Sequence, residues 1–368
     1  MTAALDDLLA RMGPERARDL YLIVGAPPTF AVDDRLVAAG ERALSGADVE
    51  RLLAPLLQGE RAAQFARRPE LDLAREVPGA GRFRINLYRQ RGQPGLVARR
   101  IRADVPTLEE LGLPAALGDV ALERRGVVLV TGAAGSGKSS TLAALVRRRS
   151  AALPGHIVTI EDPLEFVHPH GRSLVSQREV GVDTHSFHDA LRGALRQAPD
   201  VLLIGEVRDR ETAEAALRFA ETGHLVLATL HATNTVQAVD RLVHLFPTEL
   251  HAQALLALSL SLVAVVGQRL VPRADGPGRV AAVEVLLPTE RVREHVRRGD
   301  ADGLRAALRD GAPGMQAFDE SLHALVQAGR VTAAVAASHA DSPSDLLLRL
   351  RLAEAPARPA PGKRPRLL

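Results

Sequence analysis

The sequence predicts an α/β domain that follows a smaller α+β domain. Two observations predict the α/β part: short apolar runs recur along the middle of the chain, and helix-length segments separate them. The runs are residues 126–131 (GVVLVT), 157–160 (IVTI), 201–204 (VLLI) and 225–230 (LVLATL), and a fifth lies at 280–287. Bounded runs rich in Val, Leu and Ile are typical of strands buried on both faces of a parallel sheet.

Helices are expected between these strands. Residues 139–149, 187–196 and 211–221 mix polar and apolar positions over helical lengths, and Ser186 with Asp189 has the spacing of a capping box. Strands that alternate with helices along a chain indicate a parallel sheet with right-handed crossovers.

The first hundred residues have a different pattern. We expect helices at 5–12 and 46–57, and short strands at 20–24 and 29–32. Residues 82–88 (RFRINLY) alternate strictly, which predicts an antiparallel strand with one buried face. We therefore predict a first domain over residues 1–102, a connector over 103–119, an α/β domain over 120–354 with a helical distal part, and a tail over 355–368.

Composition excludes several classes of site. The chain of 368 residues has no cysteine, so disulfides, cysteine zinc sites and a thiol nucleophile are absent. The first twenty residues lack the basic-then-apolar order of a signal peptide. The longest nearly apolar stretch, residues 254–267, is shorter than the roughly 20 residues of a membrane span. We expect a soluble, cytoplasmic protein that reaches membranes through a partner.

The charge balance does not favour nucleic-acid binding. Formal net charge is +3, but the last fourteen residues (APARPAPGKRPRLL) carry four basic side chains and no acidic one, which leaves −1 for the rest. A Pro/Arg tail of this kind is expected to be disordered. Aromatic residues make up 3% and tryptophan is absent, so platforms for base stacking are scarce.

The strongest local motif predicts nucleotide binding. Residues 132–139 (GAAGSGKS) fit the pattern G-x-x-x-x-G-K-[ST], between an expected buried strand and an expected helix. Backbone N–H groups of such a loop surround the phosphates, the lysine contacts the outer phosphates and the last hydroxyl binds Mg²⁺. The predicted ATP-binding residues are Gly132, Ala133, Ala134, Gly135, Ser136, Gly137, Lys138, Ser139 and Ser140.

Polar residues follow the next strands at the edge of the sheet where ligands of α/β domains bind. EDPLE (161–165) follows one strand, and GEVRD (205–209) follows another. Carboxylates there can position a metal ion or act as a general base, or they can simply cap the following helix. His224 and His231 bracket the fourth strand, where either could be structural. They lie about 20 Å apart along the strand, so they do not share a metal ion.

These motifs together resemble the PilT/PilU family of type IV pilus retraction ATPases, within the secretion-ATPase superfamily. The phosphate loop, TIEDPLEFVH (159–168), APDVLLIGEVRD (198–209) and AETGHLVLATLH (220–231) come in the family's order and spacing. The resemblance covers all but the tail. LVARRIRADVPTLEELGLP (96–114) and SHADSPSDLLL (338–348) are more similar to the PilU branch, and TERVREHVRRGD (289–300) departs from the PilT pattern.

The resemblance implies a PAS-like first domain, a RecA-like ATPase domain and a ring of six chains with ATP and Mg²⁺ between domains. Lys138 and Ser139 carry over as phosphate and Mg²⁺ contacts, and Glu206 as the Walker B glutamate near the metal. Glu165 carries over as the catalytic carboxylate, and His224 and His231 as the histidine-box residues. Arg82, Arg84 and Arg99 match arginines that complete a neighbour's site, a task that suits a permanent, forked charge. They could also be a basic strand face in water.

The implied role is a motor for pilus retraction and twitching motility, bound to an inner-membrane platform protein and acting as an accessory to a PilT-like ATPase. Three alternatives stay open. An assembly or secretion ATPase of the same superfamily typically has a longer N-terminal region and a cysteine zinc module, which this chain lacks. A scaffold that binds ATP with little hydrolysis, and a DNA translocase, are the others.

Overall fold

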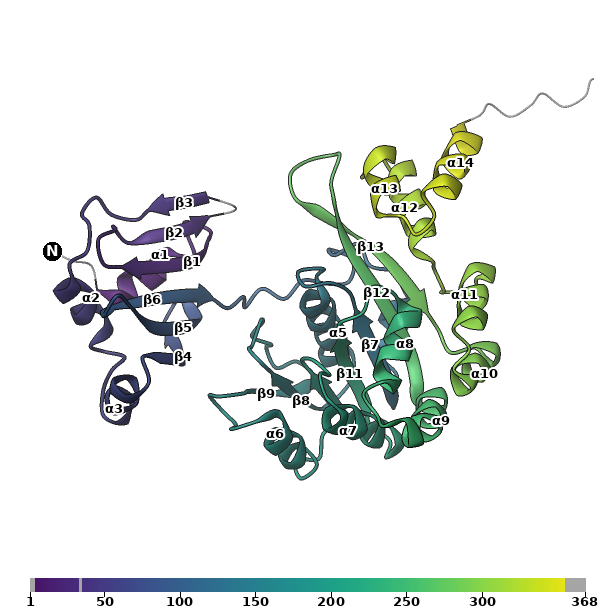
Figure 1. The fold of residues 1–368 in the computed structure, drawn as a ribbon, viewed down its shortest axis with the longest axis horizontal. Coiled ribbons are helices and arrows are strands. Elements are labelled where there is room, and N and C mark those ends of the chain that lie inside the picture. Colours follow the sequence, from purple (N-terminus) through teal and green to yellow (C-terminus); the bar gives the residue numbers. More distant parts are fainter. Residues whose placement is uncertain (1–3, 33–34, 355–368) are drawn as a thin grey trace, which may run out of the picture. The chain divides into compact units, whose positions relative to one another are not determined.

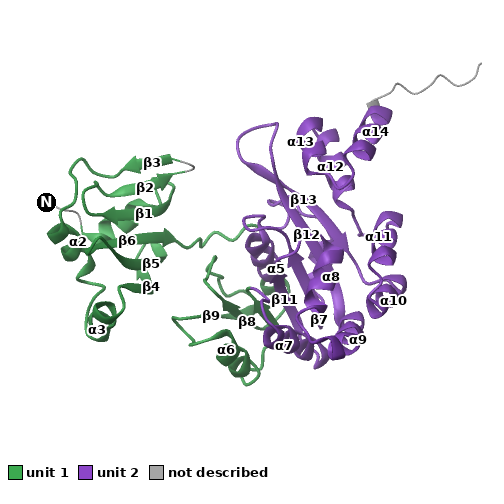
Figure 2. Ribbon diagram, in the orientation of Figure 1, with its two compact units in different colours: residues 1–106, 149–205 green, residues 107–148, 206–368 purple. Residues whose placement is uncertain are grey.

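The computed structural model describes residues 4–32 and 35–354 (Figure 1). The chain divides into two compact units, residues 1–106 with 149–205 and residues 107–148 with 206–368 (Figure 2). The predicted domain bounds at residues 102, 119 and 354 stay predictions, and the tail expected over 355–368 lies outside the described residues.

The first unit begins with a six-stranded antiparallel sheet in the order β3-β2-β1-β6-β5-β4. Its strands are β1 (Ala17–Ile23), β2 (Thr29–Val32), β3 (Arg35–Ala38), β4 (Glu70–Val77), β5 (Gly81–Gln90) and β6 (Gln93–Arg100). The helices are α1 (Leu5–Arg11), α2 (Gly46–Leu53) and α3 (Glu60–Arg67). The predicted alternation is confirmed in β5, where Phe83, Ile85 and Leu87 are all fully buried.

Three parallel strands complete the first unit, in the order β10-β8-β9. They are β8 (Gly155–Glu161), β9 (Ser173–Glu179) and β10 (Val201–Ile204), with α6 (Phe187–Ala194) beside them. Ser186 caps α6, since its hydroxyl accepts the Asp189 N–H at 3.1 Å. The register pairs Thr159 of β8 with Gln177 of β9, two residues that the acidic segment uses.

The second unit contains four strands in the order β13-β12-β7-β11. They are β7 (Gly126–Thr131), β11 (Leu225–Leu230), β12 (Leu262–Pro272) and β13 (Arg279–Leu286). β7 is parallel to both neighbours, and β13 is antiparallel to β12. Every residue of β7 and β11 is buried, as the continuous apolar runs predict for strands covered on both faces.

Helices surround these strands and form the distal part of the chain. The helices before the distal part are α4 (Ala116–Val120), α5 (Lys138–Ala152), α7 (Arg210–Glu221), α8 (Thr235–Val243), the 3₁₀ turn η1 (Thr248–Leu250) and α9 (His251–Ser261), of which α7, α8 and α9 pack against the strands. The distal helices are α10 (Glu290–Arg298), α11 (Ala301–Asp310), α12 (Phe318–Gln327), α13 (Ala333–His339) and α14 (Pro343–Glu354). The last three share an apolar cluster with β12 and β13.

The longest apolar stretch divides into two elements. α9 ends at Ser261 and β12 begins at Leu262. Leucine and alanine dominate the helical half and valine the strand half, in agreement with their preferences. Within the described residues, every helix is too short or too polar to cross a bilayer.

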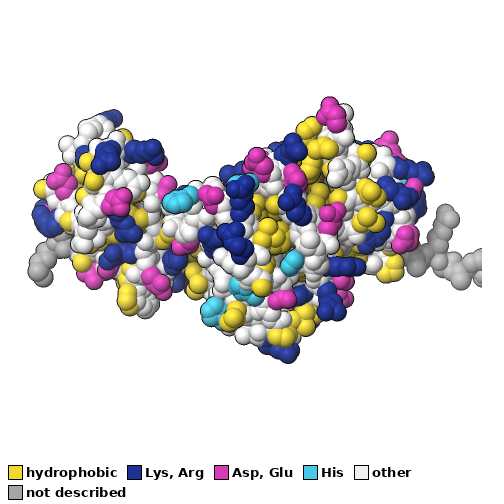
Figure 3. Space-filling view, turned by 90° about the horizontal axis from the view of Figure 1, so that it is seen from below, with side chains coloured by type: hydrophobic (Ala, Val, Ile, Leu, Met, Phe, Trp, Pro, Cys, Tyr) yellow, Lys and Arg dark blue, Asp and Glu magenta, His cyan; other side chains and the backbone are white. Residues whose placement is uncertain are grey.

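Acidic and basic side chains are interspersed on the face shown in Figure 3. Many arginines are paired within the chain, as Arg75 is with Asp6 at 2.6 Å. This pattern fits the near-neutral balance that the sequence has outside its last fourteen residues. The absence of nucleic-acid binding stays a prediction.

Candidate functional site

The phosphate loop connects β7 to α5 in the second unit. It runs from Gly132 to Gly137, and α5 begins at Lys138. Gly135 and Gly137 have φ angles of 74° and 92°, which only glycine adopts freely. The loop leads into the amino end of a 15-residue helix, and a glycine loop before a helix of this length is a binding site for phosphate.

Gln268 of β12 packs closely against this loop. A Cβ atom at Gly132 would lie 2.4 Å from the main-chain oxygen of Gln268, and one at Gly137 would lie 2.7 Å from Gln268 Nε2. The Thr141 hydroxyl donates to Gln268 Oε1 at 2.6 Å, which joins the first turn of α5 to the same side chain. The path of the loop is therefore set by β12 as well as by β7.

Lys138 is held inside the loop. Its Nζ donates to the main-chain oxygens of Gly132 and Ala133, each at 2.9 Å. Burial lowers the pKa of Lys138, and the nearby charge of Glu206 opposes that shift. Carbonyl oxygens are neutral acceptors, so a phosphate group would be a stronger partner for this ammonium group.

Glu206 follows β10, and its two carboxyl oxygens contact an arginine and a histidine. Arg208 Nε lies 2.5 Å from Glu206 Oε2, and His231 Nε2 lies 2.8 Å from Glu206 Oε1. The Glu206 side chain is only 15% exposed. His231 directly follows β11, so the structure brings together two residues that were predicted from separate motifs.

His224 precedes β11, at the opposite end from His231. Its Nδ1 lies 3.1 Å from both the Thr222 hydroxyl and the main-chain oxygen of Phe219, and its ring packs edge-on against Phe219. These contacts hold the end of α7 against the start of the strand. The catalytic role expected for His224 stays a prediction.

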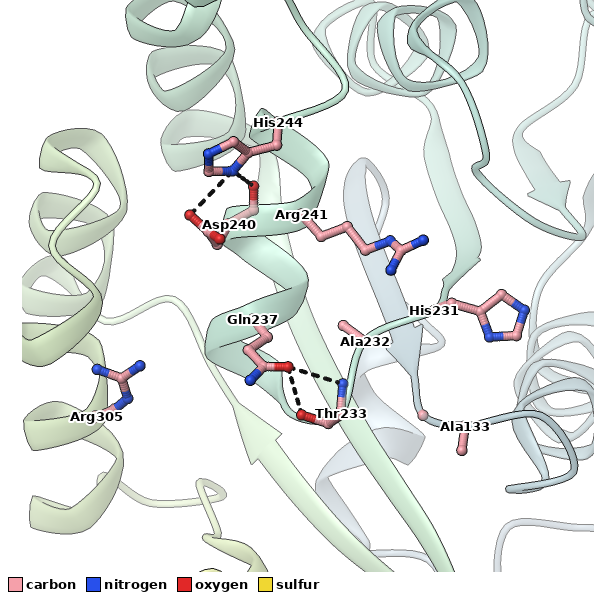
Figure 4. Close-up of a pocket in the computed structure, with 10 residues that line it drawn as sticks. Ala133, His231, Ala232, Thr233, Gln237, Asp240, Arg241, His244 and Arg305 are labelled. Atoms are coloured by element: carbon pink, nitrogen blue, oxygen red, sulfur yellow. Dashed lines mark hydrogen bonds and ion pairs between the residues drawn. The ribbon is translucent and has the colours of Figure 1, made fainter.

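A cavity of about 730 Å³ opens beside the phosphate loop. Gly132, Ala133 and residues 231–233 line one side, and α8 and α11 supply Gln237, Asp240, Arg241, His244 and Arg305. Figure 4 shows Arg241 extending from α8 toward the segment that carries His231. The volume lies in the usual range for small-molecule sites.

Glu165 lies in the acidic segment after β8, in the first unit. Its neighbours Leu164 and Phe166 are each 5% exposed, whereas Glu165 itself is exposed. Two buried apolar anchors therefore direct the Glu165 side chain outward. Glu161 at the end of β8 is itself buried, and burial raises its pKa to about 7.

Comparisons with known proteins decide the family. The family model described as type II/IV secretion system protein matches residues 96–328. The type IV pilus ATPase PilU of Pseudomonas aeruginosa is 44% identical over 348 residues, 94% of this chain and 91% of that protein. The retraction ATPase PilT of the same organism is 41% identical over 329 residues, 89% and 95% of the two chains. The chain belongs to the PilT/PilU family of pilus ATPases.

A solved structure supports the same assignment. The crystal structure of the pilus retraction motor PilT with bound ADP has a TM-score of 0.87 and 35% identity, and it covers 94% of this chain and 99% of its own. The family predicted from the motifs is thus confirmed, together with an α/β ATPase fold that follows a small antiparallel domain.

The three arginines matched to this family each have an acidic partner in the first unit. Arg82 donates to Glu179 at 3.1 Å, and Arg84 lies 3.7 Å from Asp72. Arg99 binds Asp19 through two hydrogen bonds, at 2.6 and 3.2 Å. Burial alone would raise the pKa of Asp19, but hydrogen bonds from Arg99 and Arg18 outweigh it and lower that pKa.

These pairs bear on the expected role in a neighbouring site. Arg84 would exchange an exposed ion pair for a phosphate, a small loss because such pairs contribute little. The partners of Arg82 and Arg99 are buried: the Glu179 side chain is 4% exposed and the Asp19 side chain 1%. Releasing Arg82 would leave a buried carboxyl group unpaired, and releasing Arg99 would leave buried Asp19 with Arg18 alone. Completion of a neighbour's site by these arginines stays a prediction.

Sequence reasoning missed three supporting residues in this pilus ATPase. Gln268 lies in a valine-rich strand that was not predicted, Arg241 lies on an unassigned helix, and Glu161 was seen only as part of a motif. A polar residue inside an apolar run is the one signal that could have drawn attention to Gln268.

Proposed function

We propose that this chain is an ATP-hydrolysing motor subunit for type IV pilus retraction. The observation that carries the proposal is one cluster in the second unit, where the phosphate loop, Lys138, Glu206 and His231 come together. Relatives named as pilus ATPases match nearly the whole chain, and one relative was solved with ADP.

The loop binds the phosphates of ATP in this proposal. Backbone N–H groups and the amino end of α5 contact the phosphate oxygens, and Lys138 transfers its hydrogen bonds from Gly132 and Ala133 to them. The adjoining cavity offers room for the outer phosphate and the attacking water.

Ser139 and Glu206 fit a Mg²⁺ ion because hydroxyl and carboxylate oxygens are its preferred protein ligands. Among residues 4–32 and 35–354, no group of three or more His, Cys, Asp or Glu could hold an ion by itself, so phosphate oxygens would complete the coordination. Bound there, Mg²⁺ would spread the negative charge of the phosphates.

Glu165 acts as general base in this scheme, an assignment that rests on its motif. Water attacks the outer phosphorus, Glu165 accepts a proton from that water, and the bond between the outer phosphate and ADP breaks. A positioned base of this kind contributes roughly 10²–10⁴-fold. His231 holds Glu206 in place and adjusts when the outer phosphate leaves.

The assembly follows from the family. Six chains form a ring in which Arg82, Arg84 and Arg99 complete a neighbour's site, and ATP-driven closure and opening moves an inner-membrane platform protein. The ring works in the cytoplasm at the base of the pilus, as an accessory to a PilT-like motor. The higher identity to PilU than to PilT, 44% against 41%, supports the accessory role.

A second candidate is an ATP-binding subunit with little turnover of its own. Both oxygens of Glu206 are already engaged, by Arg208 and His231. If those pairs persist with ATP bound, the carboxylate stays unavailable and turnover depends on a partner ATPase.

The test is ATP hydrolysis by the purified chain, sized by light scattering, beside Lys138→Ala and Glu206→Gln. Glu249→Gln, an exposed change on η1, is the control. If the chain is a motor subunit, we expect it to form hexamers and to hydrolyse ATP. The hydrolysis rate should then fall by about a hundredfold in both site variants. Wild-type ATP binding with turnover no faster than that of the variants would favour the second candidate.

A further inference from the structure

Glu161 is a buried carboxyl group without an assigned role. It is the last residue of β8 and only 8% of its surface is exposed. Burying a carboxylate is unfavourable unless hydrogen-bond donors replace the lost water. The raised pKa of Glu161, caused first by burial, shows that this replacement is incomplete.

Two side-chain donors nevertheless converge on this carboxyl group. The Thr159 hydroxyl donates to Glu161 Oε1 at 2.7 Å, and Gln177 Nε2 donates to the same oxygen at 3.3 Å. The buried carboxyl group therefore holds Gln177 beside the segment that carries the proposed general base.

Gln177 binds the same segment at two further points. Its Nε2 also donates to the main-chain oxygen of Phe166 at 2.9 Å, and its Oε1 accepts the main-chain N–H of His168 at 2.7 Å. Because Gln177 is the register partner of Thr159, the pairing of β9 with β8 places it beside Glu161. The segment is thus tied at residues 166 and 168.

Buried side chains on either side of Glu165 further restrict its position. Leu164 and Phe166 are both 5% exposed, and Glu165 between them is exposed. With both neighbours anchored, Glu165 has little freedom apart from its own side-chain torsions. A general base gains from this because rate depends steeply on the placement of the reacting groups.

We propose that Glu161 is a positioning residue. Its carboxyl group holds Gln177 and, through Gln177, the backbone at residues 166 and 168, which places Glu165 for proton transfer from the attacking water. This inference rests on the proposed function of Glu165. Thr159 and Gln177 act with Glu161 as a unit. Charge-assisted hydrogen bonds are about twice as strong as neutral ones, so the carboxyl group, when ionised, holds Gln177 more firmly than an amide would.

Replacing Glu161 by leucine separates this role from a merely structural one. An apolar side chain of similar volume in place of a buried charge is often neutral for stability. If Glu161 only filled space, Glu161→Leu would fold and hydrolyse ATP like wild type. Glu161→Gln keeps the shape and one acceptor and is the conservative variant.

The measurements are hydrogen–deuterium exchange of a peptide over residues 163–168, and kcat and KM for ATP, on the full-length hexamer. We expect Glu161→Leu to exchange the His168 N–H, which Gln177 binds, at least tenfold faster and to lower kcat at least tenfold, with KM changed less than twofold. Glu161→Gln should recover part of both losses.

Glu284→Leu is the matched control. Glu284 is also buried, 3% exposed, and it also binds a threonine, Thr235, at 2.7 Å, but it lies in the second unit. Its replacement should leave exchange of residues 163–168 at the wild-type rate. If Glu161→Leu fails to fold, Thr159→Val removes one donor without changing volume and should shift the same exchange in the same direction.

Wild-type exchange and wild-type kcat in a folded Glu161→Leu chain would overturn the proposal. Failure of the proposed function would look different. If Glu165→Gln hydrolysed ATP at the wild-type rate, Glu165 would not be the base, while faster exchange in Glu161→Leu would still show that Glu161 holds this segment.

Discussion

Glu206 and Glu161 are two strand-end glutamates with opposite surroundings. Glu206, after β10, binds Arg208 at 2.5 Å and His231 at 2.8 Å, and Lys138 feels its charge. Glu161, at the end of β8, is surrounded by neutral donors and by the like charge of Glu165, and its pKa rises to about 7. Glu206 thus contacts an arginine and a histidine, whereas Glu161 lies among neutral donors that also hold the acidic segment.

The difference shows how two strand ends can support two tasks. In the proposed function, a carboxyl group that binds Mg²⁺ beside phosphate needs neighbours that can move, whereas one that fixes geometry needs buried donors that cannot. Four predictions test this division, in order of expected effect.

The largest effect is expected from Glu165→Gln. Removing the proposed base should lower kcat by about 10²–10⁴-fold and leave the affinity for ATP near wild type, because a glutamine cannot accept the proton. Steady-state hydrolysis and binding of a fluorescent ATP analogue measure the two quantities. A wild-type kcat in this variant would show that Glu165 of the acidic segment is not the general base.

Gly132→Ala should affect the phosphate loop more than Gly135→Ala. Both glycines have positive φ, but the new Cβ at Gly132 would lie 2.4 Å from the main-chain oxygen of Gln268, while Gly135 has open space. We expect a loss of about 2–4 kcal/mol in unfolding free energy at Gly132 and about 1–2 at Gly135. Denaturant titration of the pair checks this, and equal losses would show that Gln268 does not constrain the loop.

His231→Asn removes one partner of Glu206. Loss of a residue that orients a group near a metal typically lowers activity about 10–100-fold, and we expect the lower end because the His231 side chain is 42% exposed. His224→Asn is the comparison variant at the other end of β11. A larger loss of activity in His224→Asn than in His231→Asn would indicate that the reaction takes place at the opposite end of β11.

The smallest effect concerns the dependence of stability on pH. Burial raises the pKa of Glu161 to about 7 and lowers that of His168 to about 4. Glu161 therefore reduces stability as pH rises from 4.5 to 7, because the unfolded chain ionises first. His168 reduces stability as pH falls from 6.5 to 4, because the unfolded chain takes up the proton first.

The two contributions oppose each other between pH 4.5 and 6.5, so single variants should reveal them. Relative to wild type, Tm of Glu161→Gln should rise more steeply with pH in this window, and Tm of His168→Gln should rise less steeply. Each group contributes at most about 1.36 kcal/mol per pH unit. Glu179, the register neighbour of Glu161, and Arg82 bound to it are the other charged groups nearby. Parallel curves for all three proteins would contradict the assignment.

The sequence predicts the parallel strands well. Residues 126–131, 201–204 and 225–230 are strands with the predicted bounds, because fully buried strands need continuous apolar runs that end sharply. β9 (SLVSQRE) was not predicted because it lacks such a run. β12 was not predicted because it begins within the same apolar stretch that forms α9.

The phosphate loop and the strand-end carboxylates could be predicted because their residues are contiguous. The pairing of His231 with Glu206, the packing of Gln268 against Gly132 and the bond from Gln177 to Glu161 could not. Gln177, for example, meets Glu161 only through the register of β8 and β9, across 16 residues of chain.

The central claim is that ATP hydrolysis by this chain powers pilus retraction. The direct measurement is the frequency and force of retraction of fluorescently labelled pili in cells whose single copy of this gene carries Glu206→Gln. We predict that retraction under load falls to the level of cells without the gene, while the variant protein is present at normal amounts. Retraction at wild-type frequency and force would contradict the account.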